Sequence, residues 1–202
     1  MFDKILAILA RFVQRKYNPL VVGVTGSVGK TTTIAAMESV FLAAGKRVRS
    51  SPHRCHNMRA PLVAVFGCPE SFISVVQWWI VIVRALRLLM FRSSTYPEVL
   101  LVEYAATVPG EMERLISMLR PSVAVITSIA PIGLERFESM EKLTREMMSL
   151  AKAVSLDGWV VLAGDDPRIL ELKNKVQSRV VTYGLTEKMD VRSAEIHVTQ
   201  QE

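Results

Sequence analysis

Short apolar runs alternate with longer stretches of helical periodicity from Leu20 onward. The run LVVGVT precedes a helical stretch from Thr31 to Ala44, which Gly45 ends, and a strand followed by a helix begins a βαβ unit. Nearly continuous apolar runs are typical of parallel strands that are covered on both faces. Such runs predict four further strands, at Val99 to Glu103, Val123 to Thr127, Trp159 to Leu162 and Val180 to Tyr183.

Helical periodicity fills the segments between these strands. The letters PGE at positions 109–111 begin one helix, which Pro121 stops. A second helix runs from about Ser139 to Val154, with an apolar stripe made of Met140, Leu143, Met147, Leu150 and Val154. The last stretch, from Asp190 onward, has the pattern of a strand. We therefore predict one α/β domain, doubly wound around a mostly parallel sheet.

The first sixteen residues, MFDKILAILARFVQRK, have the pattern of a basic amphipathic helix. Its apolar residues share one face, whereas Lys4, Arg11 and Arg15 lie away from that face. The apolar run from Ile5 to Ala10 is shorter than the core of a signal peptide, so we do not predict one. Two interpretations remain open: the helix rests on an anionic membrane, or it packs on the domain or on a neighbouring chain.

A second apolar segment, SFISVVQWWIVIVRALRLLMF, extends from Ser71 to Phe91. It reaches transmembrane length only if two arginines enter the bilayer, at a cost of about 2.5 to 3.5 kcal/mol each. Its polar residues fall on a single helical stripe made of Ser74, Gln77, Arg84 and Arg87. We therefore predict an amphipathic helix, buried or interfacial, rather than a membrane span.

The composition indicates one globular domain with a basic surface. The chain has 202 residues, of which 50% are hydrophobic and 22% charged, and this excludes disordered and low-complexity proteins. The formal net charge of +6 suits phosphates, nucleic acid or anionic lipid, but no basic motif interleaved with aromatic residues supports a nucleic-acid partner. Two cysteines without a disulfide framework favour a reducing compartment, so we expect a cytoplasmic protein, with peripheral contact at the inner face of the membrane as an open alternative.

A zinc site is one alternative for the segment PHRCHN. His53, Cys55 and His56 cluster there, and Cys68 lies thirteen residues beyond Cys55. Zinc accepts such ligands, but the H-x-C-H spacing matches no common zinc pattern. The sequence therefore does not favour zinc.

The strongest chemical signal is GVTGSVGKTTT, from Gly23 to Thr33, between a predicted strand and a predicted helix. Glycines let backbone amides approach phosphate oxygens, the helix N-terminus adds the positive end of its dipole, and the lysine and threonine suit phosphate and Mg²⁺. The strict G-x-x-x-x-G-K-[ST] pattern is not met, because Val24 occupies its first glycine. We predict that nucleotide phosphates bind to Gly26, Ser27, Val28, Gly29, Lys30, Thr31 and Thr32.

Three further segments follow the phosphate loop: VLLVEYAATVPGEMERL from Val99, RPSVAVITSIAPIGLERFES from Arg120 and DGWVVLAGDDPRI from Asp157. In this order and spacing, the four segments resemble the ATP-dependent Mur ligases of peptidoglycan synthesis. Within that family they look most similar to the UDP-N-acetylmuramoyl-tripeptide-D-alanyl-D-alanine ligase branch. The resemblance implies the central ATP-binding domain of a ligase that forms an amide bond, with ATP and Mg²⁺ as cofactors and a UDP-muramoyl-peptide-like substrate.

The resemblance also implies a role for individual residues. In this family the γ-phosphoryl group of ATP moves to a substrate carboxylate, and an amine then displaces phosphate. By position, Lys30 would hold the β- and γ-phosphates, and Thr31 and Glu103 would hold Mg²⁺. Lys30 and Glu103 are therefore the expected catalytic residues. Glu103 is also expected at the carboxyl end of a strand, where ligands bind in open α/β sheets, although a solvated charge at a strand end is the alternative.

Three positions depart from the family pattern. Gly133 stands where a magnesium-binding histidine is usual, Met147 where many of these ligases carry a carbamylated lysine, and Ala163 where an asparagine is usual. A thioether does not replace an oxygen ligand for Mg²⁺. The resemblance therefore predicts a retained nucleotide site beside a lost second metal site, and slow turnover.

We expect residues 1–18 to form the amphipathic helix and residues 19–202 to form the central domain. The N-terminal UDP-binding domain and the C-terminal domain of the family have no counterpart in the sequence. The chain is then a fragment, a protein that works with partner chains supplying those domains, or a non-catalytic nucleotide-binding module at the membrane surface.

Overall fold

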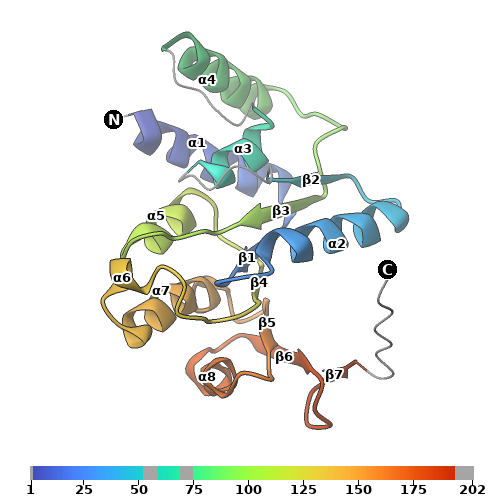
Figure 1. The fold of residues 1–202 in the computed structure, drawn as a ribbon. Coiled ribbons are helices and arrows are strands. Elements are labelled where there is room, and N and C mark those ends of the chain that lie inside the picture. The colour runs from blue at the N-terminus through green and yellow to red at the C-terminus, as the bar shows by residue number, and fades with distance from the viewer. Residues whose placement is uncertain (1, 52–58, 69–74, 194–202) are drawn as a thin grey trace, which may run out of the picture.

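The computed structural model describes residues 2–51, 59–68 and 75–193, which form an α/β fold around one sheet (Figure 1). The sheet has the strand order β2-β3-β1-β4-β5-β6-β7, and all its pairings are parallel. This confirms the predicted fold class. The strands are β1 (Leu20–Thr25), β2 (Val48–Ser50), β3 (Val99–Glu103), β4 (Val123–Ile126), β5 (Trp159–Ala163), β6 (Arg179–Gly184) and β7 (Val191–Arg192).

Helices precede and connect these strands, and the predicted N-terminal helix is present. They are α1 (Phe2–Tyr17), α2 (Lys30–Ala43), α3 (Ala60–Phe66), α4 (Val75–Met90), α5 (Glu111–Met118), α6 (Leu134–Phe137), α7 (Met140–Ala153) and α8 (Pro167–Leu170), followed by a 3₁₀ helix at Glu171–Lys175.

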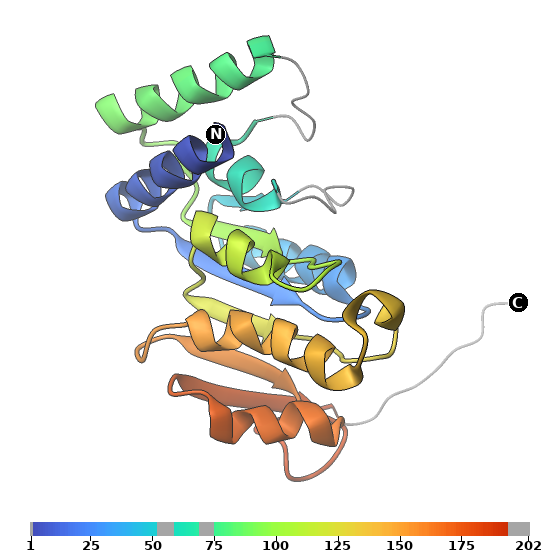
Figure 2. The ribbon, with the colours of Figure 1, turned by 90° about the vertical axis from the view of Figure 1, so that its left-hand side faces the viewer.

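The two faces of the sheet carry helical layers of different size. Figure 2 shows α5 and α7 in front of the sheet and α2 behind it. Successive strand residues point to opposite faces, so β1 contributes Val21 to the larger core and Val22 and Val24 to the core under α2. Ile34 of α2 completes that smaller core.

Helices α1, α3 and α4 form an additional layer, with α4 outermost (Figures 1 and 2). Leu6, Ala10 and Val13 of α1 are fully buried, so α1 packs on the domain, as one of the two predicted alternatives requires. The segment predicted as an amphipathic helix contains α4. No helix among the described residues has the length and apolar character needed to cross a bilayer.

Two predicted features lie partly outside the described residues. The candidate zinc ligands His53, Cys55 and His56 belong to the segment that the structure leaves out, whereas Cys68 is described and buried. The predicted C-terminal strand is described only through β7, and residues 194–202 lie outside the description.

Candidate functional site

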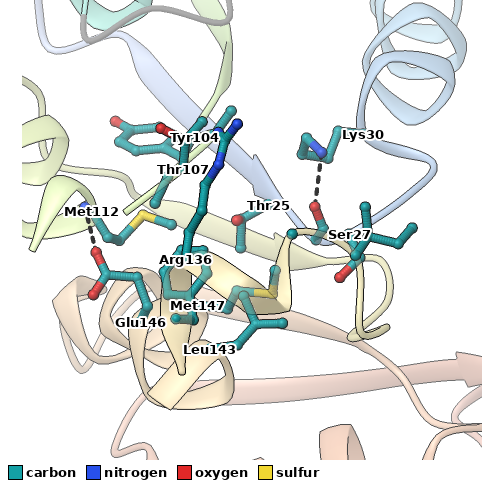
Figure 3. A pocket seen from close by; sticks show the side chains of 16 residues that line it. Thr25, Ser27, Lys30, Tyr104, Thr107, Met112, Arg136, Leu143, Glu146 and Met147 are labelled. Atoms are coloured by element: carbon teal, nitrogen blue, oxygen red, sulfur yellow. Dashed lines mark hydrogen bonds between the residues drawn. The ribbon is translucent and has the colours of Figure 1, made fainter. Parts of the chain in front are cut away.

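A cavity of about 230 Å³ lies at the carboxyl ends of β1 and β3, beside the segment that follows β4 (Figure 3). Residues of the predicted phosphate loop form one side of it, and residues of α6 and α7 form the other. Figure 3 shows Lys30 and Met147 on these two sides. Open α/β sheets bind ligands at this edge, so the fold places the predicted residues at a suitable position.

The phosphate loop connects β1 to α2 through two glycines that the backbone requires. Gly26 has φ +146°, and a Cβ added there would lie 2.1 Å from Thr127 Oγ1. Gly29 has φ +84° and precedes the first turn of α2. Residues that carry a side chain rarely adopt such backbone angles, so both glycines are needed for the loop to take this shape.

Hydrogen bonds fix the loop against the segment after β4. The Ser27 N–H donates to Ser128 O at 2.9 Å, and the Val28 N–H donates to Ser128 Oγ at 3.0 Å. Thr127 Oγ1 donates to Val28 O at 2.6 Å. These hydrogen bonds, all of them within this chain, therefore fix the conformation of the loop.

These bonds decide which amides can face a ligand. The N–H groups of Ser27 and Val28 are engaged by Ser128. The first N–H groups of an α-helix have no partner within the helix, and in α2 these belong to the residues that follow Gly29. The available donors on the loop are therefore the N–H groups at the N-terminus of α2, which also carries the positive end of the helix dipole.

Lys30, Thr31 and Glu103 come together at this helix terminus. Thr31 Oγ1 donates to Glu103 Oε2 at 3.1 Å, and Lys30 Nζ lies 4.0 Å from Glu103 Oε1. Lys30 Nζ also donates to Gly26 O at 2.8 Å. Glu103 is only 4% exposed, which excludes the interpretation of a solvated charge at a strand end.

The opposite side of the cavity is mostly apolar. Met147 and Leu143 of α7 are buried and line the cavity together with Phe137 of α6. Gly133 also lines it and precedes α6 with φ +71°, but contributes no side chain. Positions 133 and 147, where the sequence departs from the expected metal-binding residues, therefore supply no carboxylate or imidazole on this side.

The family model that matches this chain is that of the Mur ligase middle domain, over residues 24–202. The chain belongs to this family. It is 28% identical over 183 residues to the UDP-N-acetylmuramoyl-tripeptide–D-alanyl-D-alanine ligase of Mycobacterium leprae, a match that covers 88% of this chain and 30% of that protein. The ligase of the same name from Bacillus subtilis is 25% identical over 176 residues, with 87% of this chain and 32% of that protein covered.

Solved structures show the same fold. The MurF ligase from Thermotoga maritima, in complex with ADP, superposes with a TM-score of 0.70 and 24% identity, covering 93% of this chain and 38% of that chain. The chain thus spans about a third of the length of these Mur ligases.

Sequence analysis missed several polar residues that line the cavity of this Mur ligase domain. Arg136 of α6 is exposed and points into the cavity, where it adds a second cation opposite Lys30 (Figure 3). Glu146 of α7 accepts hydrogen bonds from the Gly110 N–H at 3.0 Å and the Met112 N–H at 2.7 Å. Glu146 therefore fixes the start of α5 at the cavity. Glu146 falls inside the helix predicted from about Ser139 to Val154 but outside its apolar stripe, whereas Arg136 lies in a segment where no helix was predicted.

Tyr104 closes the inner end of the cavity. Its hydroxyl donates to Leu119 O at 2.6 Å, and its burial raises the pKa of the phenol far above the ordinary value. Tyr104 is therefore a neutral structural donor at physiological pH, not an acid or base.

Proposed function

We propose that this chain binds ATP and Mg²⁺ as the ATP-binding domain of an amide-bond-forming ligase of peptidoglycan precursor synthesis. The observation that carries the proposal is the meeting of Lys30, Thr31 and Glu103 at the N-terminus of α2. A cation, a hydroxyl and a carboxylate beside unpaired helix amides suit a nucleotide phosphate with its metal ion.

The donor set fits Mg²⁺. Thr31 Oγ1 and Glu103 Oε2 are oxygen atoms 3.1 Å apart, and Mg²⁺ prefers oxygen ligands and is often bound through one or two carboxylates together with substrate phosphates. The described residues contain no group of three or more histidine, cysteine, aspartate or glutamate side chains that would form a denser metal cage. Thr31 and Glu103 would therefore hold the ion, which neutralises phosphate charge when bound.

Lys30 would bind the β- and γ-phosphates. Its ammonium group is held by Gly26 O and lies close to Glu103, so the side chain is already directed along the loop. Backbone N–H groups from Gly29 to Thr32 would bind phosphate oxygens, and Gly26 would allow the loop to pass close to Thr127. Ser27 and Val28 would contribute to phosphate binding only through the shape of the loop, because Ser128 already accepts hydrogen bonds from their N–H groups.

A non-catalytic nucleotide-binding module is the second candidate function. The packing of Met147, which is 7% exposed beside buried Leu143, favours it, because a buried thioether supplies no ligand for a second Mg²⁺. Phosphoryl transfer depends on charge neutralisation and positioning, so a site with one incomplete side binds nucleotide better than it transfers phosphate.

Several finer parts of the function belong to the same proposal. The carboxylate substrate would be UDP-muramoyl-peptide-like, and partner chains would supply the domains that longer Mur ligases contain. The division into residues 1–18 and residues 19–202, the cytoplasmic location and a weak contact of residues 1–16 with anionic membrane are also proposals. Ile5, Ile8 and Phe12 remain exposed on α1 and support that contact.

Isothermal titration calorimetry of the chain with ATP and Mg²⁺ tests the proposed site. We expect Lys30→Ala to weaken ATP binding about ten- to hundredfold, because hydrogen bonds to charged groups contribute about 1.5 to 3 kcal/mol. The matched control is Lys46→Ala, since Lys46 is an exposed lysine that pairs with Glu98. An equal affinity for the Lys30→Ala variant and the unmodified chain would show that the loop is not the phosphate site.

A further inference from the structure

Helix α4 has two apolar sides, of which the structure covers only one. Val81 and Ala85 are buried where α4 packs on the neighbouring helices. The other side exposes a set of large apolar side chains, with exposed fractions between 44% and 74%: Val76, Trp79, Ile80, Val83, Leu86 and Met90. Spacings of three and four residues place these side chains along one side of the helix. The sequence analysis expected a polar stripe, but the outer surface is predominantly apolar.

The C-terminal end of α4 is anchored to the domain. Lys16 Nζ donates to Leu88 O at 3.0 Å and to Leu89 O at 2.8 Å, and the Tyr17 hydroxyl donates to Leu88 O at 3.1 Å. The Tyr17 ring also stacks on the Tyr96 ring, with centroids 4.0 Å apart. The exposed side therefore faces outward from a helix held in place, as the outermost element of its layer (Figure 2).

Positive charge accompanies this apolar side. Arg84, Arg87 and Arg92 line the same groove as Trp79 and Ile80. The sequence from residue 71 to residue 97 contains no aspartate or glutamate. Arginine side chains beside an apolar helix face reach lipid phosphates while their stems lie along apolar surface. The neighbouring helix α1 also combines an apolar face with positive charge.

We propose that the exposed side of α4 docks in the plane of an anionic lipid bilayer. Trp79 and Ile80 enter the boundary between headgroups and acyl chains, and Arg87 contacts lipid phosphates. Charge selects the bilayer over a second copy of this chain, because a symmetric dimer would bring two sets of three arginines together with no carboxylate in the segment to pair them. The inference is independent of the nucleotide site, which lies at the carboxyl ends of the strands.

Vesicle co-sedimentation of the full chain tests this docking surface. The probes are phosphatidylcholine vesicles with and without about 30% phosphatidylglycerol, an anionic lipid whose surface charge attracts basic segments. We expect the chain to pellet with the anionic vesicles, and a Trp79→Ser/Ile80→Ser variant to lose at least tenfold in partition coefficient. An Arg84→Ala/Arg87→Ala variant should lose about fivefold in partition coefficient for each arginine and become less sensitive to added salt.

The matched control is Val40→Ser/Leu42→Ser, which removes two exposed apolar side chains of α2 and should leave pelleting unchanged. Because Trp79 and Ile80 are exposed, the melting temperature of their variant should equal that of the unmodified chain, which separates docking from folding. Absence of pelleting with anionic vesicles, or equal pelleting of the Trp79→Ser/Ile80→Ser variant, would overturn the proposal. So would a dimer in solution that these two substitutions dissociate and that does not bind vesicles.

Discussion

The two sides of the cavity differ in chemistry although one chain builds both. On the loop side, Lys30 lines the cavity and forms a polar cluster with Thr31 and Glu103 behind it at a helix terminus. On the α7 side, Met147 and Leu143 are packed as core residues. The loop side meets the requirements for binding a nucleotide phosphate, whereas the α7 side meets those for a stable helix contact.

This difference shows that nucleotide binding and phosphoryl transfer have separate structural requirements. Binding needs donors and one metal position, which the N-terminus of α2 and Glu103 would provide in the proposed site. Transfer also needs stabilisation of the charge that moves to the acceptor, and removing one such stabiliser typically lowers the rate about a hundredfold or more. Arg136 is the one described cation opposite Lys30 that reaches the cavity from α6.

The largest expected effect concerns the α7 side. We expect Met147→Ala to lower the free energy of unfolding by about 2 to 5 kcal/mol, because it leaves a cavity among buried side chains. The affinity for ATP should stay within about twofold, or about 0.4 kcal/mol, since Met147 lies on the side of the cavity opposite Lys30 (Figure 3). Urea unfolding and calorimetric titration measure the two quantities.

Met90→Ala is the control for that substitution, because Met90 is 74% exposed and its truncation leaves no cavity. Its free energy of unfolding should change by less than about 0.5 kcal/mol. If Met147→Ala were equally harmless to stability but weakened ATP binding, Met147 would belong to the binding surface, and the comparison between the two sides would fail.

The next largest effect concerns the loop side. Glu103→Gln replaces a carboxylate by a neutral amide of similar shape, so the Mg²⁺-dependent part of ATP affinity should fall by about 1.5 to 3 kcal/mol, or ten- to hundredfold. Titrations with and without Mg²⁺ separate this part from the rest. Glu98→Gln is the matched control, because Glu98 precedes β3 and pairs with Lys46 and Arg47 away from the cavity. Equal Mg²⁺ dependence in the two variants would remove Glu103 from the metal site.

The sequence predicted where the loop and Glu103 lie in the fold, and this has a physical reason. Parallel strands bring their carboxyl ends to one edge, so strand runs place Glu103 at the same edge as the loop after β1, and the structure pairs the two strands. The glycine positions also follow from local backbone needs, since Gly26 and Gly29 both have positive φ.

The remaining features depend on tertiary packing, which the sequence pattern does not encode. Strand β2 has only three residues and pairs with β3 at the edge of the sheet, and α6 is a helix of only four residues. Arg136 faces the cavity through the orientation of α6, and Glu146 uses its carboxylate to fix α5. On α4, periodicity identified an amphipathic helix but not which of its sides packs inward.

The rate of ADP release tests the central claim most directly. The chain would be mixed with ATP, Mg²⁺ and candidate muramoyl peptides at nucleotide concentrations that the titration shows to be saturating. Because the loop side carries the proposed phosphate and metal ligands while Gly133 and Met147 supply no ligand for a second Mg²⁺, we predict bound nucleotide with substrate-dependent ADP release near background. Substrate-dependent turnover at about 1 per second or faster, an ordinary enzyme rate, would contradict the account.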